Sequence, residues 1–316
     1  MSIYDRTLII DTTYECNSNC IYCQWASGNN VNRVEPSLNH LLVSPKDLEI
    51  LKIERVVFSG GEPLLSENIE RLVTYYSGHK LETIIISNGL LMSNQKASKL
   101  IKLGLGGVTF SLDTLNSQVY GILRGLNKFG LSKILHNIKD IRLNNPSLEI
   151  GINTTLTHYN IKTPNIKSLL DFVIENELDF IKFQPAFDDG YLGNNAPEAI
   201  LSSKDLNSIK ENEIMVDRYI NNGLTTNPAS FWHDLYLFIE GKVQIDPTSC
   251  SAISHQLILF NDGLRSCYWR PDFRFNRIDG SLEYLISRYR RNLNRCNVNY
   301  WCFCNQPINH KWRWLK

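Results

Sequence analysis

The chain has 316 residues, of which 43% are hydrophobic and 21% are charged, and its formal net charge is +1 at pH 7. This is the composition of a folded globular protein, and the near-zero charge gives no electrostatic reason to expect nucleic acid as a partner. No apolar run approaches the roughly 18 residues of a membrane span, and the start, MSIYDRTLIID, lacks the basic and then apolar pattern of a secretion signal. We therefore expect a cytoplasmic protein without a membrane partner.

Strand and helix patterns alternate along the first 187 residues. Short apolar strands are predicted at residues 7–11, 53–59, 81–87, 107–112, 148–156 and 179–185, and helices at 68–76, 95–103, 131–143 and 166–177. This alternation predicts parallel βα units, in which ligands bind beyond the carboxyl ends of the strands. Residues 24–45 are polar and rich in Asn, and we expect them to form a loop over that end.

The composition changes near residue 190, where we place a boundary between a domain at 1–190 and a second one at 191–316. Residues 188–201 have the composition of a loop, and helices are predicted at 206–220 and 228–240. The run LILFNDGLRSCY at 257–268 predicts a β-hairpin that turns at Asp262 and Gly263.

Three cysteines follow the first predicted strand in the run ECNSNCIYC. Cys16, Cys20 and Cys23 have the spacing C-x3-C-x2-C. Three thiolates on one short loop can bind three irons of a cubane iron–sulfur cluster and leave the fourth iron open to a ligand from outside the protein. The spacing differs from the C-x2-C-x2-C run of simple ferredoxins and from the paired C-x2-C of zinc ribbons. A zinc site or a structural group of cysteines is the alternative.

The cysteine run, with the aromatic Tyr22 directly before its last cysteine, resembles the hallmark of the radical S-adenosylmethionine (SAM) superfamily, CxxxCx(aromatic)C. The run GGEP at residues 60–63, at the end of the second apolar strand, resembles a second motif of that family. The resemblance implies an α/β fold with a partial (β/α)6 barrel. It also implies a 4Fe-4S cluster that binds SAM and supplies the electron that cleaves it to methionine and a 5′-deoxyadenosyl radical.

The resemblance further implies which residues bind SAM: Tyr22, Gly60, Gly61, Glu62, Ser87, Asn88, Ser111, Asp113, Arg124, Asn153 and Gln184. Gly60, Gly61 and Glu62 match the motif that meets the methionine amino group, and Ser87-Asn88 resembles a run that lies by the ribose. Arg124 resembles an arginine that pairs with the SAM carboxylate, which suits its forked guanidinium. For each residue the alternative is that it stabilises a turn of the backbone or forms a surface ion pair.

Five further cysteines fall in the last quarter of the chain: Cys250, Cys267, Cys296, Cys302 and Cys304. Their grouping resembles the SPASM and twitch extensions of radical SAM enzymes, which hold auxiliary 4Fe-4S clusters. Five thiolates are too few for two clusters, so we expect one auxiliary cluster in a small SPASM/twitch-like C-terminal domain. The expected ligands are the first four, although Cys302 and Cys304 can exchange because the family's final C-x2-C pair is absent. A zinc site and an open cluster with three ligands that touches substrate are the alternatives.

The resemblance predicts an enzyme whose radical abstracts hydrogen from an unactivated carbon and which is reduced by a flavodoxin- or ferredoxin-type donor. We favour a ribosomally made peptide as the substrate, which the enzyme would cross-link, epimerise or oxidise. The barrel, the C-terminal domain or a separate leader-peptide-binding protein would recognise this peptide. The alternatives are a small-molecule dehydrogenase or epimerase of the aminocyclitol or sugar type and, remotely, a non-catalytic iron–sulfur protein. The C-terminal cysteine spacing and tail of the superfamily's molybdenum-cofactor cyclases are not found here.

A spare thiol is a further prediction. If Cys304 does not bind the auxiliary cluster, its thiol hydrogen is weak enough to be donated to a carbon radical, as an epimerase requires in its last step. An inert cysteine at this position is the alternative.

Overall fold

The structure is a computed structural model of the chain, and it describes residues 6–23, 25–26, 34–186, 196–242, 256–260, 263–267, 274–275 and 282–291. Its centre is a nine-stranded sheet with the order β6-β5-β4-β3-β2-β1-β7-β8-β9. The strands are β1 (Arg6–Asp11), β2 (Ile53–Ser59), β3 (Glu82–Ser87), β4 (Gly107–Ser111), β5 (Glu149–Leu156), β6 (Phe180–Pro185), β7 (Gln256–Phe260), β8 (Gly263–Arg265) and β9 (Arg274–Phe275). Strands β1 to β7 pair in parallel, and β8 and β9 are antiparallel additions at one edge.

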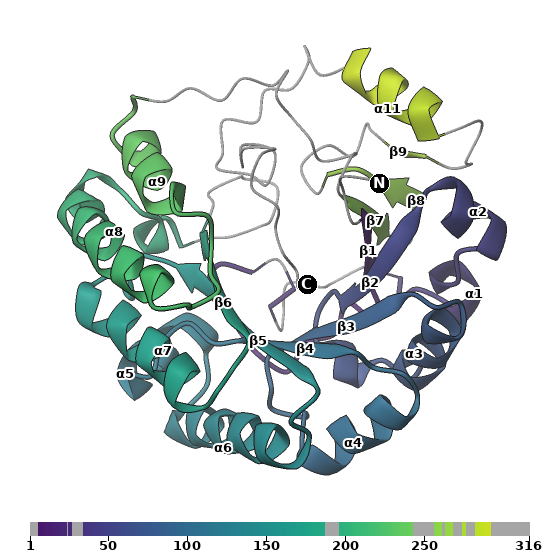
Figure 1. Cartoon of the computed structure of the whole chain (residues 1–316), viewed down its shortest axis with the longest axis horizontal. Helices are drawn as coiled ribbons and strands as arrows, with labels where there is room; N and C mark the ends of the chain where they lie inside the picture. Colours follow the sequence, from purple (N-terminus) through teal and green to yellow (C-terminus); the bar gives the residue numbers. More distant parts are fainter. Residues whose placement is uncertain are drawn as a thin grey trace.

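Helices cover the outer side of this curved sheet (Figure 1). They are α1 (Leu38–Leu41), α2 (Pro45–Ile50), α3 (Ile69–Gly78), α4 (Asn94–Lys102), α5 (Ser117–Arg124), α6 (Lys128–Asn144), α7 (Thr163–Glu175), α8 (Leu206–Asn221), α9 (Phe231–Ile239) and α11 (Leu282–Arg291). The six predicted strands of the first 187 residues are confirmed, and so are the predicted helices. The predicted loop at 24–45 is wrong at residues 38–41, where Ser37 caps a short helix. Helix α5 was not predicted.

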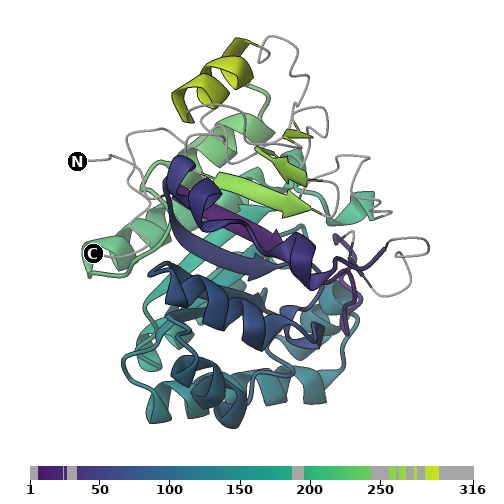
Figure 2. The same ribbon diagram turned by 90° about the vertical axis from the view of Figure 1, so that its right-hand side faces the viewer.

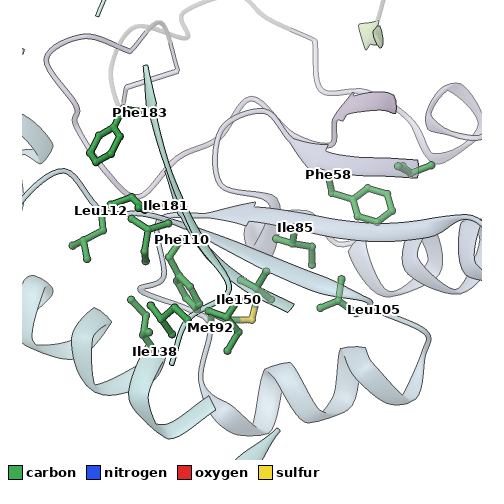
Figure 3. Packing of buried hydrophobic residues seen from close by; sticks show 14 of the residues in the cluster. Phe58, Ile85, Met92, Leu105, Phe110, Leu112, Ile138, Ile150, Ile181 and Phe183 are labelled. Atoms are coloured by element: carbon green, nitrogen blue, oxygen red, sulfur yellow. The ribbon is translucent and has the colours of Figure 1, made fainter. Parts of the chain in front are cut away.

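The hydrophobic core lies between the sheet and the helices. Alternate residues of the strands point to it, among them Phe58, Ile85, Phe110 and Ile150, and they meet Ile138 of α6 (Figure 3). Because side chains alternate along a strand, the residues between them face the opposite, concave side of the sheet. These concave positions are in register from strand to strand, so one surface runs across β1 to β6.

Strand β7 extends the sheet beyond β1. Residues Thr7–Ile10 pair with Gln256–Leu259 in parallel, so the first strand and a late strand are neighbours (Figure 2). Strand β8 pairs antiparallel with β7 through Ile258 and Arg265, which confirms the strand pairing of the predicted hairpin. The predicted turn residue Gly263 instead belongs to β8, where it pairs with Phe260, and Asp262 lies outside the described residues. This hairpin belongs to the same sheet as the barrel strands. The boundary near residue 190 stays a prediction.

The architecture is therefore an open, partial barrel of parallel strands, as the family resemblance implies. Within the described parts of the chain, no helix has the length and apolarity needed to cross a membrane.

Candidate active site

The predicted cluster loop follows β1 at its carboxyl end and is attached to α5. The backbone N–H of Asn19 donates to the carbonyl of Arg124, and that of Ile21 donates to the carbonyl of Leu123, each over 3.0 Å. Gly125 ends α5 with φ +63°, and a Cβ there would lie 2.8 Å from the Cβ of Asn19. A glycine is needed for this close approach. The end of α5 therefore fixes the shape of the loop between the cysteines.

The three thiols of the loop lie close enough to act on one another electrostatically. Burial raises the pKa of Cys16 and of Cys20, and it raises that of Cys23 to about 12, with a contribution from the charge of Cys20. The guanidinium of Arg124 acts in the opposite direction on all three. Since thiolates bind iron, cluster binding releases protons from this loop, and Arg124 favours the charged form that binds.

Arg124 is held in place by Asp113, and both side chains are buried. Arg124 Nε donates to Asp113 Oδ2 over 2.6 Å, and its Nη1 donates to Cys20 Sγ over 3.7 Å. The hydroxyl of Tyr22 also donates to Asp113 Oδ2, and the backbone N–H of Thr155 donates to its other oxygen over 2.8 Å. Burial disfavours the charge of Arg124, but Asp113 offsets this and holds its pKa well above the usual value. These contacts place a permanent positive charge beside a cluster ligand.

The GGEP turn closes against the start of the cluster loop. Gly61 N donates to Thr13 O over 2.8 Å, and Glu62 N donates to Glu15 O over 2.7 Å. A Cβ on Gly60 would lie 2.4 Å from Thr13 O, and one on Gly61 would lie 1.9 Å from Glu15 O. Any side chain at these positions would collide with the backbone that leads into Cys16. The two glycines are therefore required for contact between the second strand and the loop.

Glu62 connects this turn to the end of β3. Its carboxylate accepts from Ser87 Oγ and from the backbone N–H of Asn88, both over 2.8 Å, and from the N–H of Leu64 over 3.2 Å. Burial raises the pKa of Glu62 to about 7, although these donors act against the rise. Asn88 Nδ2 in turn donates to Asn17 Oδ1 of the cluster loop over 2.7 Å. The structure thus joins four of the predicted SAM-binding residues, Gly61, Glu62, Ser87 and Asn88, into one network beside the cysteines.

The concave face adds polar side chains further from the loop. Ser111 and Asn153 are register partners on β4 and β5, and Gln184 is exposed on β6. Lys182 of β6 shares their face, is buried, and donates from Nζ to the carbonyl of Thr226 over 2.7 Å. Burial lowers its pKa to about 8. Lys182 was missed by the sequence analysis, and its one signal is a charge within the apolar run FIKFQP.

An apolar group lines the side of the site next to β7. The rings of Tyr14 and Trp25 stack with their centroids 4.7 Å apart, and they pack with Ile258 and Phe260. Cys23 packs against the same group. An apolar surround of this kind excludes water from a cluster ligand.

Most of the predicted auxiliary-cluster ligands cannot be placed. Cys250, Cys296, Cys302 and Cys304 lie outside the described residues. Cys267 follows β8, is buried, and forms no disulfide with another described cysteine. The ligand set and the hydrogen-donor role of Cys304 therefore stay predictions.

The residues of the first loop fit the cluster that the motif implies. They supply three thiols, a cationic hydrogen-bond donor to one of them, and the buried hydroxyl of Ser18, which has no hydrogen-bond partner among the described residues. No three His, Cys, Asp or Glu side chains in the described ranges are arranged to hold a single metal ion. A cubane differs in this respect, because each thiolate binds a different iron.

Comparisons with known proteins identify the family of the chain. The profile of the Radical SAM superfamily matches residues 10–173, which span the cluster loop, GGEP and most of the barrel. A solved structure of Streptococcus suis SuiB bound to S-adenosylmethionine has a TM-score of 0.65 and 20% identity over 90% of this chain and 66% of that one. Native anSMEcpe with bound AdoMet has a TM-score of 0.64 and 20% identity over 89% of this chain and 80% of that one. The chain belongs to the radical SAM superfamily, whose cofactors are a 4Fe-4S cluster and SAM.

Curated proteins of similar sequence are named for one reaction. A probable GTP 3′,8-cyclase of Methanocaldococcus jannaschii is 27% identical over 284 residues, 84% of this chain and 86% of that protein. A GTP 3′,8-cyclase of Clostridium acetobutylicum is 31% identical over 63% of this chain and 64% of that protein. The chain thus spans slightly less than two thirds of the clostridial relative and of SuiB.

These relatives correct the predicted substrate. The sequence analysis favours a ribosomally made peptide, and that prediction is wrong because the curated relatives are named for a reaction of GTP, a small molecule. The likeness to SuiB, at 20% identity, shows the fold alone. Radical SAM chemistry is confirmed, whereas peptide maturation is not supported.

Proposed function

We propose that this protein is a radical SAM enzyme that acts on an anionic small molecule, with GTP as the first substrate to test. The observation that carries the proposal is the network of Glu62, Ser87 and Asn88 beside Cys16, Cys20 and Cys23. The chain is similar to a probable GTP 3′,8-cyclase over most of its length, although it lacks the C-terminal cysteine spacing and tail of the molybdenum-cofactor cyclases. A bound cluster supplies the single electron that cleaves the sulfonium of SAM.

The residues around the loop bind and orient SAM in this proposal. The Glu62 carboxylate lies where the family motif meets the methionine amino group, and an ammonium ion beside it would lower its pKa from about 7. Ser111 and Asn153 extend the polar surface along the ends of β4 and β5. Arg124 is engaged with Asp113 and Cys20, so we assign it to the cluster side of the site and not to the SAM carboxylate.

Lys182 supports an anionic substrate. It is a buried ammonium group on the concave face, two residues before Gln184, in register with Asn153 of β5. A positive charge on this face attracts an anionic group that binds within reach. Its pKa of about 8 leaves it mostly protonated at neutral pH. The triphosphate of a nucleotide has the chemistry that matches it.

Substrate labelling tests the proposal. A ring closure between positions 3′ and 8, as the relatives' name states, removes hydrogen from C3′. Anaerobically reconstituted enzyme, reduced with dithionite, should form 5′-deoxyadenosine with SAM and GTP, and [3′-²H]GTP should transfer deuterium into it. ATP is the matched control nucleotide. SAM cleavage that GTP neither accelerates nor labels would contradict GTP as the substrate and leave a different small molecule as the substrate.

A further inference from the structure

We propose that the α5–α6 surface, formed by Ile122, Lys128, Phe129 and Lys133, is the docking site for an acidic one-electron carrier protein that reduces the first cluster. The proposal rests on the radical SAM chemistry of this chain and needs no particular substrate. The carrier is oxidised by one electron and the cluster is reduced by one, so no other reactant is required.

The surface lies directly behind the cluster loop. Helix α5 ends at Arg124, which donates to Cys20 Sγ over 3.7 Å, and Ile122 is two residues earlier on the same helix. Asn19 of the loop is exposed and touches Gly125, the residue that turns the chain from α5 to α6. A protein that covers this turn therefore approaches Cys20 from outside, without entering the concave face where SAM and substrate bind.

Two apolar side chains on this surface are exposed without forming part of the core. Phe129, the second residue of α6, is 72% exposed, and Ile122 is 48% exposed. A phenylalanine loses little conformational entropy when a partner covers it, which makes it suited to an interface. The backbone of Phe129 is fixed by Asn127, whose Oδ1 caps α6 by accepting from the N–H groups of Phe129 and Gly130. The ring is thus held on a rigid helix end and not on a loop.

The charges around these residues have one sign. From residue 117 to residue 134, which covers α5 and the first turns of α6, the charged residues are Arg124, Lys128 and Lys133, and Arg124 is buried in its ion pair with Asp113. Lys128 and Lys133 are exposed on the first turns of α6, and Lys128 Nζ lies 5.5 Å from the centre of the Phe129 ring. An apolar centre with lysines at its rim matches a carrier with an acidic rim around its redox group.

The chain provides matched controls at the opposite end of the same helices. The C-terminal ends of α4 and α6 lead into the starts of β4 and β5, whereas the cluster loop follows the end of β1. Lys102 is exposed at the end of α4, and Leu143 is 81% exposed near the end of α6. Lys102→Glu makes the same change of charge as Lys128→Glu, and Leu143→Ala also removes an exposed apolar side chain, but both changes lie far from the loop.

The test compares two reductants on the reconstituted full-length enzyme. With reduced flavodoxin, an acidic flavoprotein, as electron donor, Lys128→Glu and Phe129→Ala should each lower kcat/KM for the donor by about tenfold at low salt. The difference for Lys128→Glu should vanish as salt screens the charges. Dithionite needs no docking site, so dithionite-supported SAM cleavage should stay at the wild-type rate in both variants, which separates this proposal from the proposed function. Lys102→Glu and Leu143→Ala should behave as wild type with either reductant.

Three results would overturn the assignment. The first is an equal loss in Lys128→Glu and Lys102→Glu, which would indicate an effect of overall charge. The second is wild-type activity with flavodoxin, and with a bacterial ferredoxin as second donor, in both Lys128→Glu and Phe129→Ala. The third is a dimer in light scattering that Phe129→Ala converts to a monomer, because the surface would then bind a second copy of this chain.

Discussion

Arg124 donates a hydrogen bond to the Sγ atom of Cys20, and Asp113 holds it there from the other side. The arrangement links a strand end, a helix end and a cluster ligand through buried charges. A positive charge beside a cluster favours the reduced state, which carries one more negative charge.

We expect Arg124→Gln to make the reduction potential of the first cluster more negative by about 60 mV, which corresponds to about 1.4 kcal/mol for one electron. A redox titration followed by EPR measures it. The variant should also lose about 3–5 kcal/mol of stability, because Asp113 is left buried and unpaired. The double variant Arg124→Gln/Asp113→Asn should regain much of that stability but keep the lower potential. An unchanged potential in the double variant would limit Arg124 to a structural role.

Replacing Cys16, Cys20 and Cys23 together with Ala should abolish 5′-deoxyadenosine formation. Iron should fall by about four atoms per chain relative to wild type, because each cubane holds four. Iron that remains in this variant would be bound by the later cysteines, which tests the predicted auxiliary cluster separately. Single Cys→Ser changes at Cys302 and Cys304 then identify the ligand, since a ligand variant loses that remaining iron and a hydrogen-donor variant keeps it.

Glu62→Ala should weaken SAM binding about ten- to a hundredfold, because a carboxylate bonded to an ammonium group contributes roughly 1.5–3 kcal/mol. It should also destabilise the protein, since the buried N–H groups of Leu64 and Asn88 lose their acceptor. Ser87→Ala is the matched control. It removes one donor to Glu62 at a cost of about 1 kcal/mol but leaves the carboxylate in place. Calorimetric SAM titrations that give equal affinities for both variants would contradict a direct contact.

Gly61→Ala should prevent assembly of the first cluster, because its Cβ would lie 1.9 Å from the carbonyl oxygen of Glu15. Gly106→Ala is the control, because a Cβ at that position would lie no closer than 3.4 Å to any neighbouring atom. Cluster assembly should be normal in this variant if the loss is specific to the GGEP turn. Absorbance of the reconstituted cluster near 400 nm, on the order of that expected for a 4Fe-4S centre, reports assembly. Normal assembly in Gly61→Ala would show that the loop can move away from the GGEP turn.

Glu149, on β5, gives the fold a dependence on pH. Burial, helped by the charge of Glu82, raises its pKa to about 7 from 4.5. The folded protein therefore keeps a proton that the unfolded chain loses as pH rises above 4.5, so this group's contribution to stability is complete below that pH and is lost by about pH 7. Glu149→Gln removes the loss. In urea unfolding, the variant should be more stable than wild type by about 1–2 kcal/mol at pH 8, a figure that is reduced because Glu149 is partly exposed. At pH 4.5 the two proteins should have the same free energy of unfolding. Glu175→Gln, at an exposed site, controls for net charge.

The strands could be predicted from the sequence, and the superfamily could be predicted from the cysteine motif, both for physical reasons. Buried parallel strands are continuous apolar runs, and the cluster spacing is local to eight residues. Helix α5 was not predicted because the run SQVYGILR is short and contains Gly121. The helix depends on a cap from Asn116 and on the packing of Tyr120 and Leu123. Without that helix, nothing in the sequence could bring Arg124 to Asp113 and Cys20. The substrate could not be derived at all, since the polar side chains of the concave face, Lys182 among them, come together only in the fold.

The pairing of β1 with β7 has a consequence for synthesis on the ribosome. The strand that carries the cluster loop receives its second neighbour only when residues 256–259 have been made, about 250 residues later. At roughly 5–20 residues per second, that edge of β1 waits on the order of 10–50 seconds for its partner. During this time the nascent chain exposes an unpaired, apolar strand edge next to three reduced thiols, a combination prone to association with other chains. Iron delivery and late-strand pairing therefore compete with aggregation in time, and slowing translation near the end of the message should lower the yield of soluble protein.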